Sequence, residues 1–164
     1  MHVVPQQVPG TKYGPKWLQY YAKIATETAK LSTAIKLKVG CVIVKDNRIL
    51  SIGYNGMPSG WSNECETSDT DLDYTLTFNQ KYLRTKPEVL HAEANALMKL
   101  CKSTDSSEGA TLFVTHYPCI ECAKLIYQAG ISQVYYINEY NASKGSGYNF
   151  LQEAGIEVCQ IKKE

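Results

Sequence analysis

The sequence lacks long hydrophobic runs and an excess of charge of either sign. No stretch approaches the roughly 18 apolar residues of a transmembrane helix, and residues 1–16 lack the apolar core of a secretory signal. Its 17 basic and 16 acidic side chains leave a net charge of +1, whereas proteins that bind long nucleic acids need a basic surface to neutralise phosphates. We therefore expect a cytoplasmic protein that binds no membrane and no polymeric nucleic acid.

Closely spaced cysteines are also scarce. The chain has six cysteines, of which only Cys119 and Cys122 lie near each other in sequence. A disulfide framework is unusual in a chain without a secretion signal. The spacing of this pair instead favours a metal or redox role.

Repeats, low-complexity stretches and shifts in composition are absent as well, so we expect a single domain over residues 1–164. Residues 1–14 are expected to form an N-terminal tail, and residues 55–88 a long loop or insertion with a short helix near 74–84. Apolar periodicity predicts the other helices at residues 15–31, 92–102, 120–129 and 148–154. Strands are predicted at residues 39–44, 48–54, 111–117, 132–138 and 156–161.

The order of these elements indicates the fold class. The first two strands are joined by the polar turn 45–47 and should form an antiparallel hairpin. The later strands alternate with helices, which implies that they pair in parallel. The predicted fold is therefore α/β, with a mixed five-stranded sheet covered by helices on both faces in three αβα layers.

Two short segments carry residues with metal-binding chemistry. His91 begins one predicted helix, and Pro118, Cys119 and Cys122 begin another. Zinc binds imidazole nitrogen and thiolate sulfur, and catalytic zinc sites use three protein ligands and keep one open position. The N-terminus of a helix also favours the thiolate form of cysteine. We therefore predict that His91, Cys119 and Cys122 hold one Zn²⁺.

Glu93 follows His91 by two residues, so on a helix its carboxylate points away from the imidazole. It can lie beside the metal without being a ligand and can move protons during catalysis. The pattern H-x-E followed by P-C-x-x-C is the signature of zinc-dependent nucleobase deaminases. An alternative is a closed structural zinc site, in which the fourth ligand is one of Cys65, Cys101 or His116.

These motifs resemble the cytidine deaminase superfamily, and more closely its deoxycytidylate (dCMP) deaminases from phages and eukaryotes. The similarity covers residues 16–161 and is carried by five segments, at residues 39–40, 53–60, 91–96, 118–124 and 154–158. The resemblance implies a cytidine-deaminase-like fold and hydrolysis of dCMP to dUMP and ammonia, which feeds dTTP synthesis. It further implies a homohexamer that is activated by dCTP and inhibited by dTTP, with Mg²⁺ as a candidate companion of the effector.

The resemblance also assigns roles to individual residues. It places Asn55, Ala92 and Tyr117 against the substrate. It places the effector nucleotide near the GYNG segment, formed by Gly53, Tyr54, Asn55 and Gly56.

The phosphate contact is open, because many relatives carry Arg-Ser-Lys after the first helix and this chain has Leu31-Ser32-Thr33. The candidates for this contact are Ser32, Lys36, Lys38, Arg84 and Lys86. A second, structural zinc is not predicted, because only Cys65 is suitably placed for one. Two alternative functions remain: deamination of another cytosine nucleoside, nucleotide or tRNA base, and a non-catalytic nucleotide sensor stapled by zinc.

Overall fold

The computed structural model describes residues 12–68 and 83–162, and its centre is a five-stranded sheet. The strands lie in the order β2-β1-β5-β6-β7, where β1 runs antiparallel to β2 and β5, and β5, β6 and β7 are parallel. Their bounds are β1 (Gly40–Lys45), β2 (Arg48–Tyr54), β5 (Thr111–His116), β6 (Gln133–Asn138) and β7 (Glu157–Gln160). The predicted mixed sheet, with an early hairpin and later parallel strands, is confirmed.

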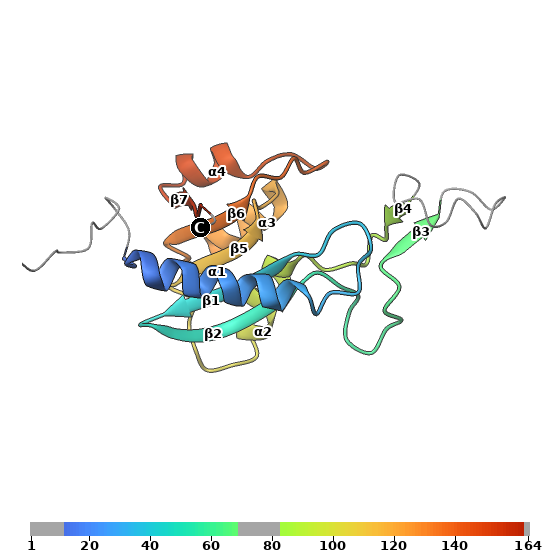
Figure 1. Cartoon of the computed structure of the whole chain (residues 1–164), viewed down its shortest axis with the longest axis horizontal. Coiled ribbons are helices and arrows are strands. Elements are labelled where there is room, and N and C mark those ends of the chain that lie inside the picture. The colour runs from blue at the N-terminus through green and yellow to red at the C-terminus, as the bar shows by residue number, and fades with distance from the viewer. Residues whose placement is uncertain (1–11, 69–82, 163–164) are drawn as a thin grey trace, which may run out of the picture.

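Helices cover both faces of this sheet (Figure 1). The helix α1 (Pro15–Ala29) packs on one face, against β1 and β5. The opposite face carries α2 (Ala92–Leu100), α3 (Ile120–Gln128) and α4 (Tyr148–Glu153). The three-layer arrangement expected from the order of elements is therefore also confirmed.

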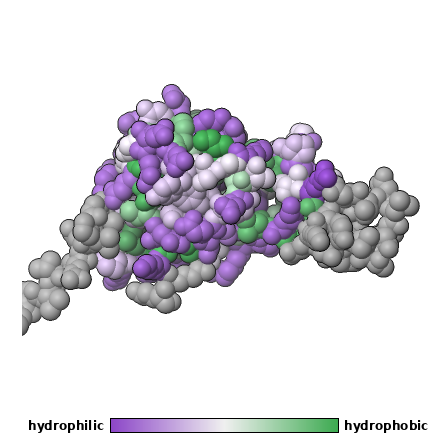
Figure 2. Space-filling view, turned by 90° about the horizontal axis from the view of Figure 1, so that it is seen from above, coloured by the Kyte–Doolittle hydropathy of each residue, from purple (hydrophilic) through white to green (hydrophobic). Residues whose placement is uncertain are grey.

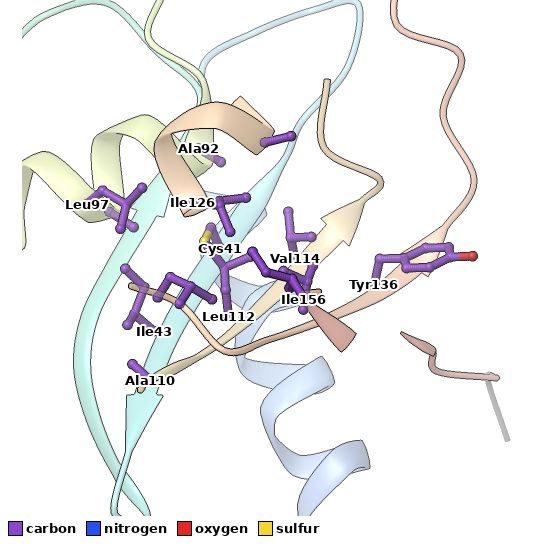
Figure 3. Packing of buried hydrophobic residues seen from close by; sticks show 14 of the residues in the cluster. Cys41, Ile43, Ala92, Leu97, Ala110, Leu112, Val114, Ile126, Tyr136 and Ile156 are labelled. Carbon is purple, nitrogen blue, oxygen red and sulfur yellow. The ribbon is translucent and has the colours of Figure 1, made fainter. Parts of the chain in front are cut away.

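Alternation along the buried strand β1 builds the two cores. Val42 and Val44 face α1, whereas Cys41 and Ile43 face the other three helices, because successive side chains of a strand point to opposite faces. Figure 3 shows the second of these cores, with side chains of α2 and α3 meeting those of β1 and β5. The sheet thus fixes α2 and α3 side by side on one face.

The hairpin between β1 and β2 turns at Asp46 and Asn47, where the sequence predicts it. Both residues have positive φ, 49° and 58°, as a two-residue hairpin turn of the I′ type requires. The hydroxyl of Tyr21 donates a hydrogen bond to Asn47 Oδ1 at 2.8 Å, which ties the turn to α1.

The insertion at residues 55–88 contains a small sheet that apolar periodicity does not reveal. Its strands β3 (Glu66–Ser68) and β4 (Leu83–Thr85) pair antiparallel, to the right of the main sheet in Figure 1. The short helix expected near 74–84 is wrong at its end, where Leu83 and Arg84 belong to β4, since their backbones pair with residues distant in sequence. The rest of that helix, and residues 1–11 of the expected tail, lie outside the described residues.

The surface seen from above in Figure 2 is mostly hydrophilic, with small apolar patches between polar side chains. No helix in the described part of the chain is both long and apolar enough to cross a membrane.

Candidate metal centre

The N-termini of α2 and α3 bring the three predicted metal ligands together. His91 and Cys119 are the N-cap residues of these helices, both in extended conformation, and Cys122 lies in the first turn of α3. The segment before α2 is held by two backbone hydrogen bonds between Gly56 and Leu90. Each ligand is therefore fixed by the start of a helix and by the strand or bridge that precedes it.

The spacing of the ligand atoms fits a zinc ion. His91 Nδ1 lies 3.4 Å from Cys122 Sγ and 3.5 Å from Cys119 Sγ, and all three ligand atoms lie within 4.8 Å of one another. Zinc bonds of about 2.0 Å to nitrogen and about 2.3 Å to sulfur, at a tetrahedral angle, place these atoms about 3.6 Å apart. The residues present therefore match the group that the motif implies.

Of the two cysteines, Cys119 favours the thiolate form and Cys122 the protonated form. Hydrogen bonds from Cys122 and from His91 lower the pKa of Cys119 to about 3, although burial opposes them. The pKa of the Cys122 thiol is raised, because it donates to Cys119 and is buried. One thiolate is thus available before a cation arrives, and binding of the cation would release the second proton.

The described residues supply no fourth ligand to this cluster, which consists of His91, Cys119 and Cys122. Cys65 lies beside Thr33 instead, with 3.5 Å between the sulfur and Thr33 Oγ1. Cys101 is exposed at the opposite end of α2. His116 Nδ1 lies 3.0 Å from Thr115 Oγ1 and outside the cluster. The part of the chain that is described thus offers three ligands, as an open site requires.

Glu93 lies in the first turn of α2 and is only 4% exposed, and its carboxylate is not part of the ligand cluster. Burial raises the pKa of this carboxyl, because the charged form loses its hydration, and its own backbone N–H and His91 oppose the rise. Glu93 can therefore hold a proton at a higher pH than an exposed glutamate does, which suits a group that gives and takes protons.

A cavity of about 530 Å³ opens in front of these groups. Its walls include six of the residues that the sequence assigns to the metal, to proton transfer or to the substrate: Asn55, His91, Ala92, Glu93, Tyr117 and Cys119. Lys36, a candidate for the phosphate contact, lines it as well. Most of the predicted site thus converges on one cavity.

Asn55 supports a wall of this cavity with its side-chain amide. Its Oδ1 accepts a hydrogen bond from Val39 N at 2.8 Å, and its Nδ2 donates to Leu37 O, also at 2.8 Å. One N–H and one lone pair of the amide remain for a ligand. Asn55 can therefore hold the loop before β1 and contact a bound molecule at the same time.

Tyr117 lines the cavity and is buried. The ring packs edge-on against Tyr136, with centroids 4.7 Å apart. The hydroxyl is buried without a hydrogen-bond partner among the residues described. Burial raises the pKa of this hydroxyl, so it remains protonated and can only act as a neutral donor or acceptor.

The remaining phosphate candidates differ in their placement. Ser32 is buried, and its hydroxyl donates to Asn55 O at 2.7 Å and accepts from Ala34 N. Lys38 is exposed, and neither Ser32 nor Lys38 lines the cavity. Arg84 and Lys86 line a hollow next to it.

Of the GYNG segment, only Asn55 lines the cavity. Tyr54 accepts a hydrogen bond at its carbonyl from Asn95, and Lys99 lies 5.2 Å from its ring centroid. Gly53 lies where β2 contacts α2, and Gly56 pairs with Leu90. These three residues thus connect β2 and the following turn to α2 and the segment before it.

The sequence reasoning missed the loop after β6, from which Glu139, Tyr140 and Ser143 line the cavity. A signal was present, because ligands of α/β proteins bind beyond the carboxyl ends of parallel strands. This polar loop follows β6 directly, and β6 is parallel to the strand that leads to Cys119. Glu66 and Thr85, from the small sheet β3–β4, had no such signal.

Replacing Gly53 with alanine should displace α2. The added Cβ would lie 2.5 Å from Ala96 N and closer still to Ala92 O, and both are backbone atoms that cannot rotate away. We expect Gly53→Ala to lower the free energy of unfolding by about 1–3 kcal/mol, measured by urea denaturation in EDTA. In Gly56→Ala the nearest atom to the new Cβ is 3.8 Å away, so this control should change stability by less than about 1 kcal/mol. Equal effects of the two changes would contradict the close approach.

Comparison with known proteins identifies related chains. Residues 15–138 match the family model of the cytidine and deoxycytidylate deaminase zinc-binding region. The ComE operon protein 2 of Bacillus subtilis is 36% identical over 146 residues, which make up 89% of this chain and 71% of that protein. Human deoxycytidylate deaminase is 38% identical over 125 residues, 76% of this chain and 66% of that protein.

A solved structure is also similar. The dCMP deaminase of the cyanophage S-TIM5, in complex with dCMP and dUMP, aligns with a TM-score of 0.79 and 41% identity. The alignment covers 91% of this chain and 99% of that one. The family model runs from the first residue of α1 to the last of β6, so it includes the candidate ligands and Glu93 and ends before the loop after β6.

Proposed function

The chain belongs to the cytidine and deoxycytidylate deaminase family, and from this membership we propose that it hydrolyses dCMP to dUMP and ammonia and so feeds dTTP synthesis. The observation that carries the proposal is the three-ligand cluster with the buried Glu93 beside it, facing a cavity of about 530 Å³. The similarity to a deaminase solved with dCMP and dUMP supports the choice of substrate.

His91, Cys119 and Cys122 would hold a zinc ion, which supplies Lewis acidity and so makes a water molecule a nucleophile near neutral pH. Glu93 takes the first proton of the attacking water and gives it to the ring nitrogen of the pyrimidine. It then takes the second proton, from the hydroxyl group formed at the attacked carbon, and gives it to the amino group, which leaves as ammonia. Its burial supports this role, because the carboxyl then holds a proton more readily than an exposed one does.

The other cavity residues orient the base in this proposal. Asn55 offers its remaining N–H and lone pair to the sugar, while its other hydrogen bonds keep it fixed. Tyr117 offers an apolar ring surface for the pyrimidine. Ala92 is small and fully buried, which leaves room for the base next to Glu93.

The test compares substrates directly. Zinc-loaded protein is incubated with dCMP, CMP, deoxycytidine and tRNA, and the deaminated products are quantified. We expect dUMP from dCMP at the highest kcat/KM. A higher kcat/KM for deoxycytidine or tRNA would favour a deaminase of another substrate, and no product from any substrate would favour a zinc-stapled nucleotide sensor. X-ray absorption would distinguish the sensor from a deaminase, because the sensor requires four protein ligands around zinc and the deaminase three.

Regulation and assembly are part of the same proposal. We propose that the protein is a homohexamer, that dCTP activates it and that dTTP inhibits it. Mg²⁺ would bind together with the effector triphosphate. Rates of dCMP turnover with each nucleotide, with and without Mg²⁺, test the regulation, and sedimentation velocity tests the assembly. A cytoplasmic location fits this function, because metal-binding thiols persist in a reducing compartment and the six cysteines are free.

A further inference from the structure

A second hollow, of about 440 Å³, adjoins the cavity and is strongly basic. Among the described residues, four with cationic side chains line it: Lys36, Arg84, Lys86 and Lys144. None of the described residues that line it carries a carboxylate. The cations come from three separate parts of the chain, namely the loop before β1, the segment at β4 and the loop after β6. A run of charges along one segment would not produce this convergence.

Lys144 is brought to the hollow by backbone contacts. The loop after β6 is fixed to the start of α3 by hydrogen bonds from Ile120 N to Gly145 O and from Gly147 N to Pro118 O. The backbones of Cys119 and Ser146 also pair in an isolated antiparallel β-bridge. Lys144 therefore lies in a loop that is anchored next to a candidate metal ligand. This loop lies beyond the part of the chain that the family model matches.

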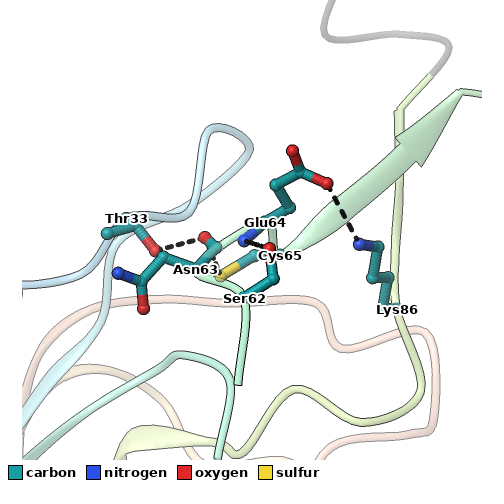
Figure 4. A network of polar contacts seen from close by, with 6 residues as sticks. All are labelled: Thr33, Ser62, Asn63, Glu64, Cys65 and Lys86. Carbon is teal, nitrogen blue, oxygen red and sulfur yellow. Dashed lines mark hydrogen bonds and ion pairs between the residues drawn. The ribbon is translucent and has the colours of Figure 1, made fainter. Parts of the chain in front are cut away.

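Lys36 and Lys86, the two other lysines that line the hollow, differ in their contacts with acidic side chains. Lys86 Nζ lies 3.7 Å from the exposed carboxylate of Glu64. Figure 4 marks this ion pair with a dashed line. The carboxylate of Glu66 accepts hydrogen bonds from the backbone of Ile35 and Lys36 and lines the main cavity. No ion pair of the Lys36 ammonium occurs within residues 12–68 and 83–162.

The hollow and the cavity are continuous at their shared walls. His91 and Cys119 line both, and so do Lys36, Thr85 and Ser143. A molecule whose reacting end lies at Glu93 can therefore extend into the basic hollow, past the hydroxyl groups of Thr85 and Ser143. The base and the phosphate of a nucleoside monophosphate lie at opposite ends of its sugar, which suits this arrangement.

We propose that this hollow binds the 5′-phosphate of the substrate, with Lys36 and Lys144 as its principal contacts and with Ser143 and Thr85 as hydroxyl donors. The inference rests on the proposed deamination of a nucleotide. It supplies the phosphate contact that the missing Arg-Ser-Lys segment leaves open, and assigns it partly to the loop after β6. Two ammonium groups match the charge of a phosphate near −2.

The test separates phosphate binding from catalysis. In Lys36→Gln and Lys144→Gln we expect the KM for dCMP to rise about 10- to 100-fold, the loss of one hydrogen bond between charged groups. The kcat/KM for deoxycytidine, which has no phosphate, should stay within about twofold. Zinc content should not change, and Lys→Arg at either position should restore much of the affinity for dCMP.

Two lysine variants serve as controls. Lys124→Gln removes an exposed lysine of α3 that pairs with Glu121 and lines neither the cavity nor the hollow, so it should leave the turnover of both substrates unchanged. Lys38→Gln removes a charge two residues from Lys36 and outside the hollow, so it should raise the KM for dCMP much less. Equal effects at positions 36 and 38 would overturn the assignment to this hollow.

Direct binding distinguishes a failure of this inference from a failure of the proposed function. Calorimetry of dUMP and deoxyuridine with the zinc-loaded protein measures the phosphate contribution without turnover. We expect each lysine variant to weaken the binding of dUMP and to leave the binding of deoxyuridine unchanged. If the unaltered protein deaminates dCMP but its variants bind dUMP equally well, this inference fails and the proposed function stands. If the unaltered protein deaminates only deoxycytidine and binds dUMP no better than deoxyuridine, both fail.

Discussion

Glu93→Gln should lower kcat for dCMP by about 10²- to 10⁴-fold, the range that general acid–base catalysis contributes, while one zinc per chain remains bound. Glutamine keeps the shape of the side chain but cannot accept and return a proton. Zinc should stay because the ligand cluster does not include Glu93. Activity is measured as dUMP formation and zinc by atomic absorption of the same sample.

The stability of this variant provides a second check. Burial raises the pKa of the Glu93 carboxyl in the folded chain. Such a group destabilises the folded state once the pH exceeds its unfolded pKa of about 4.3, because folding then disfavours the charge. Glutamine removes that cost, so the metal-free variant should melt at or above the temperature of the metal-free parent at pH 8.

Glu121→Gln is the matched control for the same substitution. Glu121 also lies in the first turn of a helix at this site, but it is exposed and pairs with Lys124. Its replacement should change kcat by less than about twofold, since surface ion pairs contribute little. Retention of full activity by Glu93→Gln, or loss of its zinc, would contradict the proton-transfer role.

The clustering of the two candidate cysteine ligands was predictable, because their positions are set locally. A helix start and a one-turn spacing place Cys119 and Cys122 together, whatever the rest of the fold does. Their meeting with His91 is not local. It follows because α2 and α3 pack on the same face of the sheet, through side chains such as Ala92 and Ile126. The alternation of strands and helices predicts that face only in outline.

The walls of the cavity were less predictable, because irregular loops supply much of them. Ser32, Lys36 and Lys38 lie within seven residues of one another, yet only Lys36 lines the cavity. The hydroxyl of Ser32 binds the carbonyl of Asn55 instead, a contact between segments 23 residues apart. Pairing of β3 with β4 is similarly non-local, since it depends on backbone groups rather than on an apolar pattern. Periodicity carries no information on such contacts.

Cys122→Ser should abolish both zinc binding and dCMP deamination. A serine hydroxyl does not become an anion near neutral pH as a thiol does, so only His91 and Cys119 remain as strong ligands. In the parent, zinc binds the folded chain and should therefore raise the melting temperature in a concentration-dependent way. That dependence should vanish in Cys122→Ser, as measured by thermal unfolding across a zinc titration buffered with chelator.

Cys101→Ser makes the same substitution at the opposite end of α2, on an exposed thiol outside the ligand cluster. It should keep one zinc, the zinc-dependent melting temperature and full activity, because no metal contact is lost. A variant at position 101 that lost its zinc would reveal a fourth ligand and a closed site. Since a closed zinc has no open position for an activated water, the same result would also remove the basis for hydrolysis at this centre.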